Sequence, residues 1–307
     1  MLSYSLKRLG SAVPTLLILI TVAFFLIRIA PGGPFDSEKA LPPEIQANLE
    51  AKYQLDDPLV IQYFRYLGDI LTLDFGPSFH YRDWTVNQLI AQGAPVSFTL
   101  GAIALVLAFV MGVTIGILAA LRQNSLVDYL TMSVAMVGIS IPNFVAAPLL
   151  ILLFAIGLGW LPAGGWDGSI GRMVLPAVAL SLPMVAYVAR IMRGSMIEAL
   201  HSSFIRTARA KGMPEREVIL RHALKPALLP VISYLGPAAA AILTGSVVIE
   251  RIFTIPGIGS HFVQGALNRD YTLVMGVVIF YGLLIILLNY LVDLLYAWLD
   301  PRIRYDR

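Results

Sequence analysis

Long runs of apolar residues, separated by shorter polar connections, dominate this sequence. Six runs are long enough for a helical membrane crossing, which needs about 20 apolar residues to span a hydrocarbon core about 30 Å thick. These runs do not alternate between polar and apolar residues as the strands of a membrane barrel do. The pattern predicts an all-α membrane protein with six transmembrane helices, at approximately Leu9–Ile29, Val96–Leu121, Tyr129–Leu158, Met173–Met192, Pro230–Ile249 and Leu273–Trp298.

Composition agrees with the membrane class and excludes several kinds of chemistry. The 307 residues are 58% hydrophobic and 13% charged, about half the charged share of an ordinary soluble domain. Cysteine is absent and the net charge is only +3, which argues against disulfides, thiolate metal sites and nucleic-acid binding. The four histidines (His80, His201, His222 and His261) are scattered, and no metal-ligand or nucleophile spacing connects them. We expect no catalytic residue, metal site or cofactor in this chain, so a membrane-embedded enzyme is disfavoured.

Basic residues near the ends of the apolar runs predict the orientation, because lysine and arginine stay on the cytoplasmic side. Lys7 and Arg8 precede the first run, and Arg302, Arg304 and Arg307 follow the sixth. The connection between the fourth and fifth runs, residues 193–229, is also strongly basic. Both termini and this connection are therefore predicted to be cytoplasmic. The first run exceeds a signal peptide in length and lacks a small-residue cleavage site, which indicates an uncleaved anchor.

The resulting organisation has three parts. Residues 1–30 form a cytoplasmic lead and the first transmembrane helix, residues 31–95 face outward, and residues 96–307 form the transmembrane core. In the outer segment, a helix is expected from Pro42 to about Lys52. A second begins with Asp57 as N-cap and Pro58 in the first turn, and carries an apolar stripe of Leu59, Ile61, Tyr63, Phe64, Leu67, Ile70 and Leu71. This stripe is either a lid packed on the bundle or a docking surface, and both interpretations stay open.

Several residues within the runs indicate how the helices pack and move. The Gly112-x-x-x-Gly116 spacing predicts close helix packing. Four prolines can kink or open helices: Pro142, Pro148, Pro183 and Pro237. Charged residues fall near the ends of the runs, where snorkelling costs little: Arg28, Arg190, Glu250, Arg251 and Asp293. The absence of a central acidic or histidine relay, and of matched halves with broken helices, disfavours an ion-coupled secondary transporter.

The basic connection contains a short predicted helix that ends at Gly212. At helical spacing one face carries Phe204, Thr207, Ala208 and Lys211. Small side chains there would let a partner approach closely, while Phe204 would fill a pocket. Gly212 suits a left-handed C-terminal turn, and Pro214 suits the first turn of a second helix. From the residues alone, this element is either a docking site for a soluble partner or a basic loop that touches anionic lipid head groups.

This connection resembles the cytoplasmic signature loop of permease subunits of binding-protein-dependent ABC importers. The Thr207–Gly212 form is similar to the peptide/nickel branch of that family. The resemblance covers nearly the whole chain, and its other motifs include Asp74–Phe79, Gly194–Glu198, Arg221–Lys225, Glu250–Gly259 and Gly265–Tyr271. The Asp74–Phe79 and Gly265–Tyr271 runs resemble the B-type subunit of oligopeptide permeases. Two features depart from the family pattern: Arg206-Thr207-Ala208 replaces Glu-Ala-Ala, and Leu224-Lys225 replaces a closing Leu-Pro.

The resemblance implies a type I importer permease with six transmembrane helices in the bacterial plasma (inner) membrane. Such a subunit forms the pathway with a second, homologous permease and couples to two cytoplasmic ATPase subunits, which hold ATP and Mg. A periplasmic or extracellular binding protein delivers the peptide substrate. This chain lacks a Gly-x-x-x-x-Gly-Lys-[Ser/Thr] phosphate loop of its own, which agrees with a transport subunit that is not an enzyme. Dipeptides, nickel or another small solute remain alternative substrates.

The resemblance also implies two sets of site residues. Residues 255–259 correspond to an outer loop that is expected to contact the binding protein or to form an outer gate: Ile255, Pro256, Gly257, Ile258 and Gly259. Coupling to the ATPases is expected at Ser203, Phe204, Ile205, Arg206, Thr207, Ala208, Arg209, Ala210, Lys211, Gly212, Met213 and Glu215.

Overall fold

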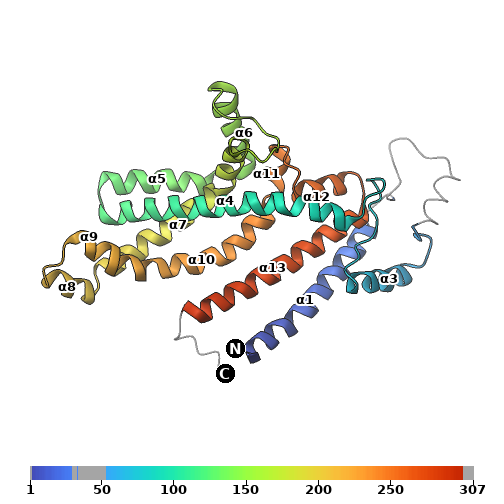
Figure 1. The fold of residues 1–307 in the computed structure, drawn as a ribbon, viewed down its shortest axis with the longest axis horizontal. Helices are drawn as coiled ribbons and strands as arrows, with labels where there is room; N and C mark the ends of the chain where they lie inside the picture. The colour runs from blue at the N-terminus through green and yellow to red at the C-terminus, as the bar shows by residue number, and fades with distance from the viewer. Residues whose placement is uncertain (1, 30–32, 34–52, 300–307) are drawn as a thin grey trace. The chain divides into compact units, whose positions relative to one another are not determined.

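The structure is a computed structural model of the chain and describes residues 2–29, 33 and 53–299 (Figure 1). Regular structure in these residues is helical, apart from one antiparallel bridge between Pro77 and Thr85. They form two compact units: one combines the described residues up to Val96 with Pro256–Tyr290, and the other consists mainly of Ser97–Ile255. The helix expected from Pro42 to Lys52 lies outside the described residues.

The first unit is built on two long apolar helices and three shorter helical segments. Its elements are α1 (Leu2–Ile29), α3 (Leu59–Leu71), the beginning of α4 (Val86–Leu121), α12 (Ile258–Leu267) and α13 (Tyr271–Leu299) as far as Tyr290. A side chain added at Gly282 of α13 would collide with Leu19 of α1, so these two helices pack closely. A buried cluster that includes Phe75, Val86, Leu89, Ile258 and Leu273 joins the other segments to α13. The core of this unit is thus apolar and assembled from distant parts of the sequence.

The second unit surrounds the long helix α7. Its elements are the rest of α4, α5 (Leu126–Ser140), α6 (Asn143–Leu150), η1 (Ile151–Gly157), α7 (Ile170–Leu200), α8 (Ser203–Ala210), α9 (Glu215–Glu217), η2 (Val218–Ala223), α10 (Leu224–Gly245) and α11 (Val247–Ile252). A Cβ at Gly112 would lie 2.6 Å from Val188, and one at Gly116 would lie 2.6 Å from Met192. Only glycine lets α4 approach α7 this closely, which confirms the predicted packing role of the Gly112/Gly116 pair.

Within the described residues, five helices have the length and apolar character needed to cross a membrane, and the count reaches six when a bent pair is included as one crossing. The predicted third run is not one straight helix. Instead, α5 ends at Ser140, α6 begins at Asn143, and the two arms are bent by 109°. Pro142 lacks the backbone N–H that would continue the helix, and Ile141 before it is extended at φ −92° and ψ 117°. The proline predicted to kink the chain breaks it completely.

Two other expectations require correction. Glu250, predicted to reach the membrane surface, is fully buried; it accepts hydrogen bonds from the hydroxyls of Ser97 at 2.7 Å and Ser246 at 2.6 Å. These partners compensate the cost of removing the carboxyl group from water. At the start of α3, Pro58 is the N-cap instead of Asp57. The Asp57 carboxylate pairs with Arg65 at 2.5 Å, so it braces the helix from the side.

Candidate coupling site

The short helix α8 lies where α7 and α10 come together at one end of their unit (Figure 1). Its end is fixed by a Schellman turn. The N–H of Gly212 donates to the carbonyl of Arg209 at 2.9 Å, and the N–H of Met213 donates to that of Ala208 at 3.4 Å. Gly212 has φ +77°, the left-handed conformation that its position predicted. The helix therefore has a defined end and a defined exit direction.

One face of α8 is anchored in the bundle. Ile205 is fully buried and Ala208 nearly so. Both belong to an apolar cluster that includes Met196 of α7 and Ala223 of η2. Burying an isoleucine side chain stabilises this contact by about 1.5–3 kcal/mol. The short helix is thus held against α7 and η2.

The opposite face of α8 is exposed. Phe204, Arg206, Thr207 and Lys211 are all accessible, and Phe204 keeps 47% of its surface exposed. Ala208, which the helical spacing had placed on the face of Phe204, is buried instead. Its angular position lies between those of Phe204 and Ile205, and the bundle covers that edge of the helix.

The residues after Gly212 lead into the short helix α9. Helix α8, the turn at Gly212 and α9 together form a helix–turn–helix element, which we call the coupling bracket. Pro214 caps α9 and lies one position before its first helical residue. The Arg209 guanidinium donates to Glu215 at 2.6 and 3.1 Å across the turn. This hydrogen-bonded carboxylate raises the pKa of Arg209 above its usual value. The pair is about half exposed, so its contribution to stability is modest, at most about 1 kcal/mol. Arg206 forms no ion pair among the described residues.

An ion pair braces α7 ten residues before α8. Arg193 donates to both oxygens of Asp128 at 2.6 Å, and the Asp128 side chain is 2% exposed. Asp128 also accepts the backbone N–H of Asn124 at 2.9 Å, while Ser125 caps α5. The N-terminus of α5 is thereby tied to the segment of α7 that leads into α8.

The sequence boundary between the two units falls within the expected outer loop, directly after Ile255. Ile255 belongs to the second unit and is fully buried. In the first unit, Pro256 is exposed, whereas Gly257, Ile258 and Gly259 are buried at the start of α12. A Cβ at Gly93 would lie 2.9 Å from the backbone nitrogen of Ile258, so α4 approaches α12 closely there. Among residues 255–259, only Pro256 has an exposed side chain.

A buried carboxylate joins the two runs that resemble B-type permeases. Asp270 is fully buried and accepts the backbone N–H groups of Phe79 at 3.1 Å and His80 at 3.2 Å, as well as the hydroxyl of Ser78. It also accepts the N–H of Leu273 at 3.1 Å at the beginning of α13. One side chain thus fastens the turn at Ser78–His80 to the N-terminus of α13. None of the described residues form a group of three or more potential metal ligands.

Comparison with known proteins identifies the family. A family model described as "Binding-protein-dependent transport system inner membrane component" matches residues 112–305, and the model of its N-terminal region matches residues 1–101. The oligopeptide transport system permease protein OppB of Salmonella typhimurium is 60% identical over 99% of this chain and its own full length. The chain belongs to the permeases of binding-protein-dependent ABC importers.

Other relatives define how far this likeness extends. OppB of Haemophilus influenzae is also 60% identical over 99% of the permease. The dipeptide transport system permease DppB of Bacillus subtilis is 48% identical over the whole chain and 99% of its own length. Among solved structures, the MetNI methionine transporter has a TM-score of 0.60 at 16% identity, covering 69% of this permease and 97% of that chain. An amino acid ABC transporter has a TM-score of 0.54 at 19% identity, covering 68% and 93%. These two share the fold.

Two features of the permease were not predicted from its sequence: the ion pair of Asp128 with Arg193 and the hydrogen bonds of Asp270. The Ser125-x-x-Asp128 spacing is a capping signal that marks the start of α5. It gives no indication of the pairing with Arg193, which is 65 residues away. The resemblance in Gly265–Tyr271 marked a motif around Asp270. It did not indicate which residues form hydrogen bonds with this carboxylate.

Proposed function

We propose that this permease imports oligopeptides delivered by an external binding protein. It forms the translocation pathway with a second, homologous permease, and two cytoplasmic ATPase subunits supply the energy. ATP and Mg are held by the ATPases, and this chain contributes a conformational change and no covalent chemistry. The high identity to OppB proteins along the whole chain supports oligopeptides as substrates. The DppB relative makes dipeptides the second candidate.

The observation that carries the coupling mechanism is the two-faced character of α8. Its buried face is anchored by Ile205 and Ala208, while Phe204 and Arg206 are available to a partner. A force on the exposed face therefore passes directly into α7 and α10. We propose that Ser203–Met213 and Glu215 form the coupling site, and that each ATPase holds one such bracket in a surface cleft.

Alternating access follows from this geometry. ATP binding draws the two ATPases together, the coupling brackets move with them, and the attached helices open the pathway outward. Hydrolysis reverses the movement and releases peptide inside. Residues 255–259 act as an outer gate more than as a docking surface, because all except Pro256 are buried. The exposed proline is the point at which the binding protein would contact this gate.

The proposed placement is the bacterial plasma membrane with both termini cytoplasmic. Residues 1–30 form the lead and first helix, residues 31–95 the periplasmic segment, and residues 96–307 the core with its coupling loop at 193–229. The basic residues of that loop favour the cytoplasmic side.

Purification of the tagged permease from native membranes tests the partners and the substrate together. We expect a second permease and two ATPase subunits to co-purify. The complex, reconstituted in vesicles with its binding protein and ATP, should accumulate tripeptides to pentapeptides in preference to dipeptides or nickel. Preference for dipeptides would move the substrate assignment to the second candidate. Uphill uptake by this chain alone would refute the coupling model.

A further inference from the structure

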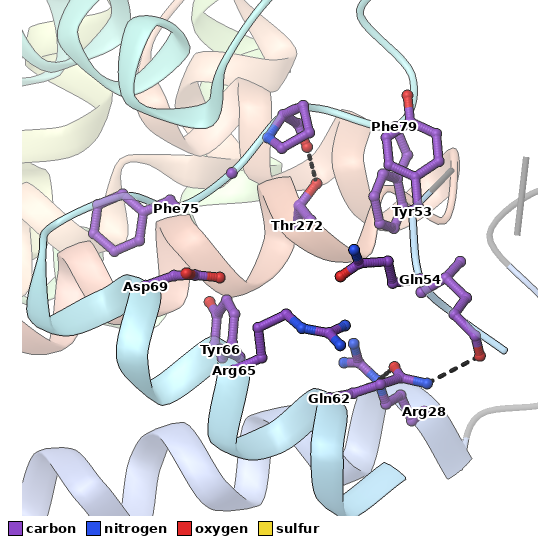
Figure 2. A pocket seen from close by; sticks show the side chains of 13 residues that line it. Arg28, Tyr53, Gln54, Gln62, Arg65, Tyr66, Asp69, Phe75, Phe79 and Thr272 are labelled. Carbon is purple, nitrogen blue, oxygen red and sulfur yellow. Dashed lines mark hydrogen bonds between the residues drawn. The ribbon is translucent and has the colours of Figure 1, made fainter. Parts of the chain in front are cut away.

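Helix α3 packs Tyr66, Leu67 and Ile70 against the apolar core of its unit but leaves several other large apolar side chains exposed. Gln62, Arg65 and Asp69 lie on its polar face and line a cavity of about 320 Å³ (Figure 2). Gln62 is nearly buried and donates to the carbonyls of Leu55 at 2.9 Å and Asp57 at 2.8 Å. The polar face therefore borders this cavity, with Gln62 inside the protein and Arg65 and Asp69 exposed.

One part of the apolar face is exposed. Val60, Phe64 and Leu71 are 61%, 66% and 86% exposed. At about 100° per residue, these three side chains fall within about 40° of each other on the helix surface. They form one stripe along α3, which we call the α3 stripe. A helix surrounded by water would bury such a stripe and expose its polar face.

The position of α3 on α1 indicates what covers the stripe. Tyr63 shares a hydrogen bond of 2.7 Å with Thr21 of α1, and its ring lies 5.3 Å from that of Phe24. Arg28 donates to Gln62 at 3.1 Å. Thr21 is eight residues before the end of α1, about 12 Å along the axis at 1.5 Å per residue. Helix α3 thus lies beside the last turns of a membrane-spanning helix, at the depth of the bilayer boundary.

The neighbouring surface of α1 is also apolar and exposed. Val22, Leu26 and Ile29 are 50%, 63% and 75% exposed and follow each other on one face of α1. In a membrane-spanning helix such side chains contact lipid. The α3 stripe and this face of α1 are thus two exposed apolar surfaces of the same unit, and the aromatic side chains Tyr63 and Phe64 suit the membrane–water interface.

We propose that α3 is a membrane-interface helix whose stripe of Val60, Phe64 and Leu71 is buried among lipid acyl chains, in the leaflet at the C-terminal end of α1. Helices of this type lie in the plane of the interface with the apolar face about 5–10 Å below the head groups. The outer segment of the permease is then held at a fixed depth and tilt by lipid, and its polar cavity is turned away from the bilayer.

Depth-dependent fluorescence quenching tests this proposal in the assembled importer. The permease has no cysteine of its own, so Phe64→Cys and Leu71→Cys each provide a single site for a bimane label once the partner chains are cysteine-free. Asp69→Cys is the matched control, because Asp69 is exposed on the opposite face of the same helix. Each complex is placed in nanodiscs that contain lipid brominated in the acyl chains, and is separately titrated with aqueous iodide.

We expect brominated lipid to quench the labels at positions 64 and 71 and iodide to leave them nearly unaffected, with the reverse at position 69. Retained co-purification of the partner chains shows that each variant assembles. Two results would overturn the proposal. Quenching of positions 64 and 71 by iodide as strong as at position 69 would place the stripe in water. Protection from both quenchers would show that a protein chain, either the second permease or the binding protein, covers it.

Discussion

Replacing Gly212 with valine is predicted to uncouple ATP hydrolysis from transport without preventing membrane insertion. Gly212 has φ +77°, where L-amino acids are strained, and valine is among the residues least able to adopt it. Apart from its sequence neighbours, no heavy atom of the described residues lies within 4 Å of a Cβ added there. The substitution therefore strains the backbone and creates no clash with that part of the permease.

The expected size of the effect follows from the turn that Gly212 closes. A left-handed conformation costs an L-residue roughly 1–2 kcal/mol. This energy opposes the two Schellman hydrogen bonds to Arg209 and Ala208. Because about 1.4 kcal/mol corresponds to a factor of ten, the ratio of closed to open turn falls by roughly 5- to 30-fold. Coupling should fall with it, since an open turn lets α8 move without α9.

Peptide uptake and ATPase activity of the reconstituted importer provide the assay, with Gly212→Asn and Gly212→Ala as matched variants. Asparagine tolerates the left-handed conformation better than alanine although its side chain is larger. The order of uptake should therefore be Gly212, then Asn, then Ala, then Val. Wild-type uptake by Gly212→Val would refute the docking model. A loss that follows side-chain size, with Asn worse than Ala, would refute the strain argument and indicate direct contact with the ATPase.

Three further predictions concern charged groups. Arg206→Glu should weaken co-purification of at least one ATPase. Arg122→Glu makes the same change at an exposed loop position outside the coupling loop and should not weaken it. Equal retention of the ATPases by both variants would remove Arg206 from the interface. Asp128→Asn should lower the free energy of unfolding by about 1–3 kcal/mol, because it weakens the shielded ion pair with Arg193. In thermal melting, the double variant with Arg193→Gln should lose less stability than the sum of the two single variants. Fully additive losses of stability would contradict the pairing. Glu250→Ala should lower the free energy of unfolding by about 1–3 kcal/mol, because it removes the carboxylate that accepts from two buried hydroxyls. Glu250→Gln keeps an acceptor oxygen and should melt closer to the wild type. Equal losses of stability in both variants would argue against this role.

Features set by a single residue or a short repeat were predictable from the sequence. Gly212 indicated its left-handed turn because glycine alone adopts that conformation without cost. The Gly112 and Gly116 pair indicated a close helix contact, which α7 provides. Pro142 indicated an interruption. Its severity was not predictable, because a single proline can either kink a helix or end it, depending on the packing around it.

Features that join distant residues were not predictable in the same way. Hydrophobic periodicity placed Glu250 near the end of a run and therefore near water. Its burial depends on Ser97, which is 153 residues away and comes from another helix. Asp270 likewise binds the backbone of Phe79 and His80, which are 191 and 190 residues away. Such clusters form only when the fold brings the donors together, and their partners leave no spacing pattern in the chain.

This difference bears directly on the coupling site. Part of the exposed face of α8 follows local rules: helical spacing grouped Phe204, Thr207 and Lys211, all exposed, although Ala208 of the same group is buried. Arg206 was included only through the resemblance to the permease family. In the proposed mechanism, transmission of force depends on the buried face, where Ile205 belongs to the same apolar cluster as Met196. A flexible attachment would let α8 follow the ATPase while α7 stayed in place. The buried contacts of Ile205 and the Schellman turn at Gly212 fix α8 at its two ends and prevent such independent movement. A displacement of α8 must therefore displace α7 or break either these contacts or the turn.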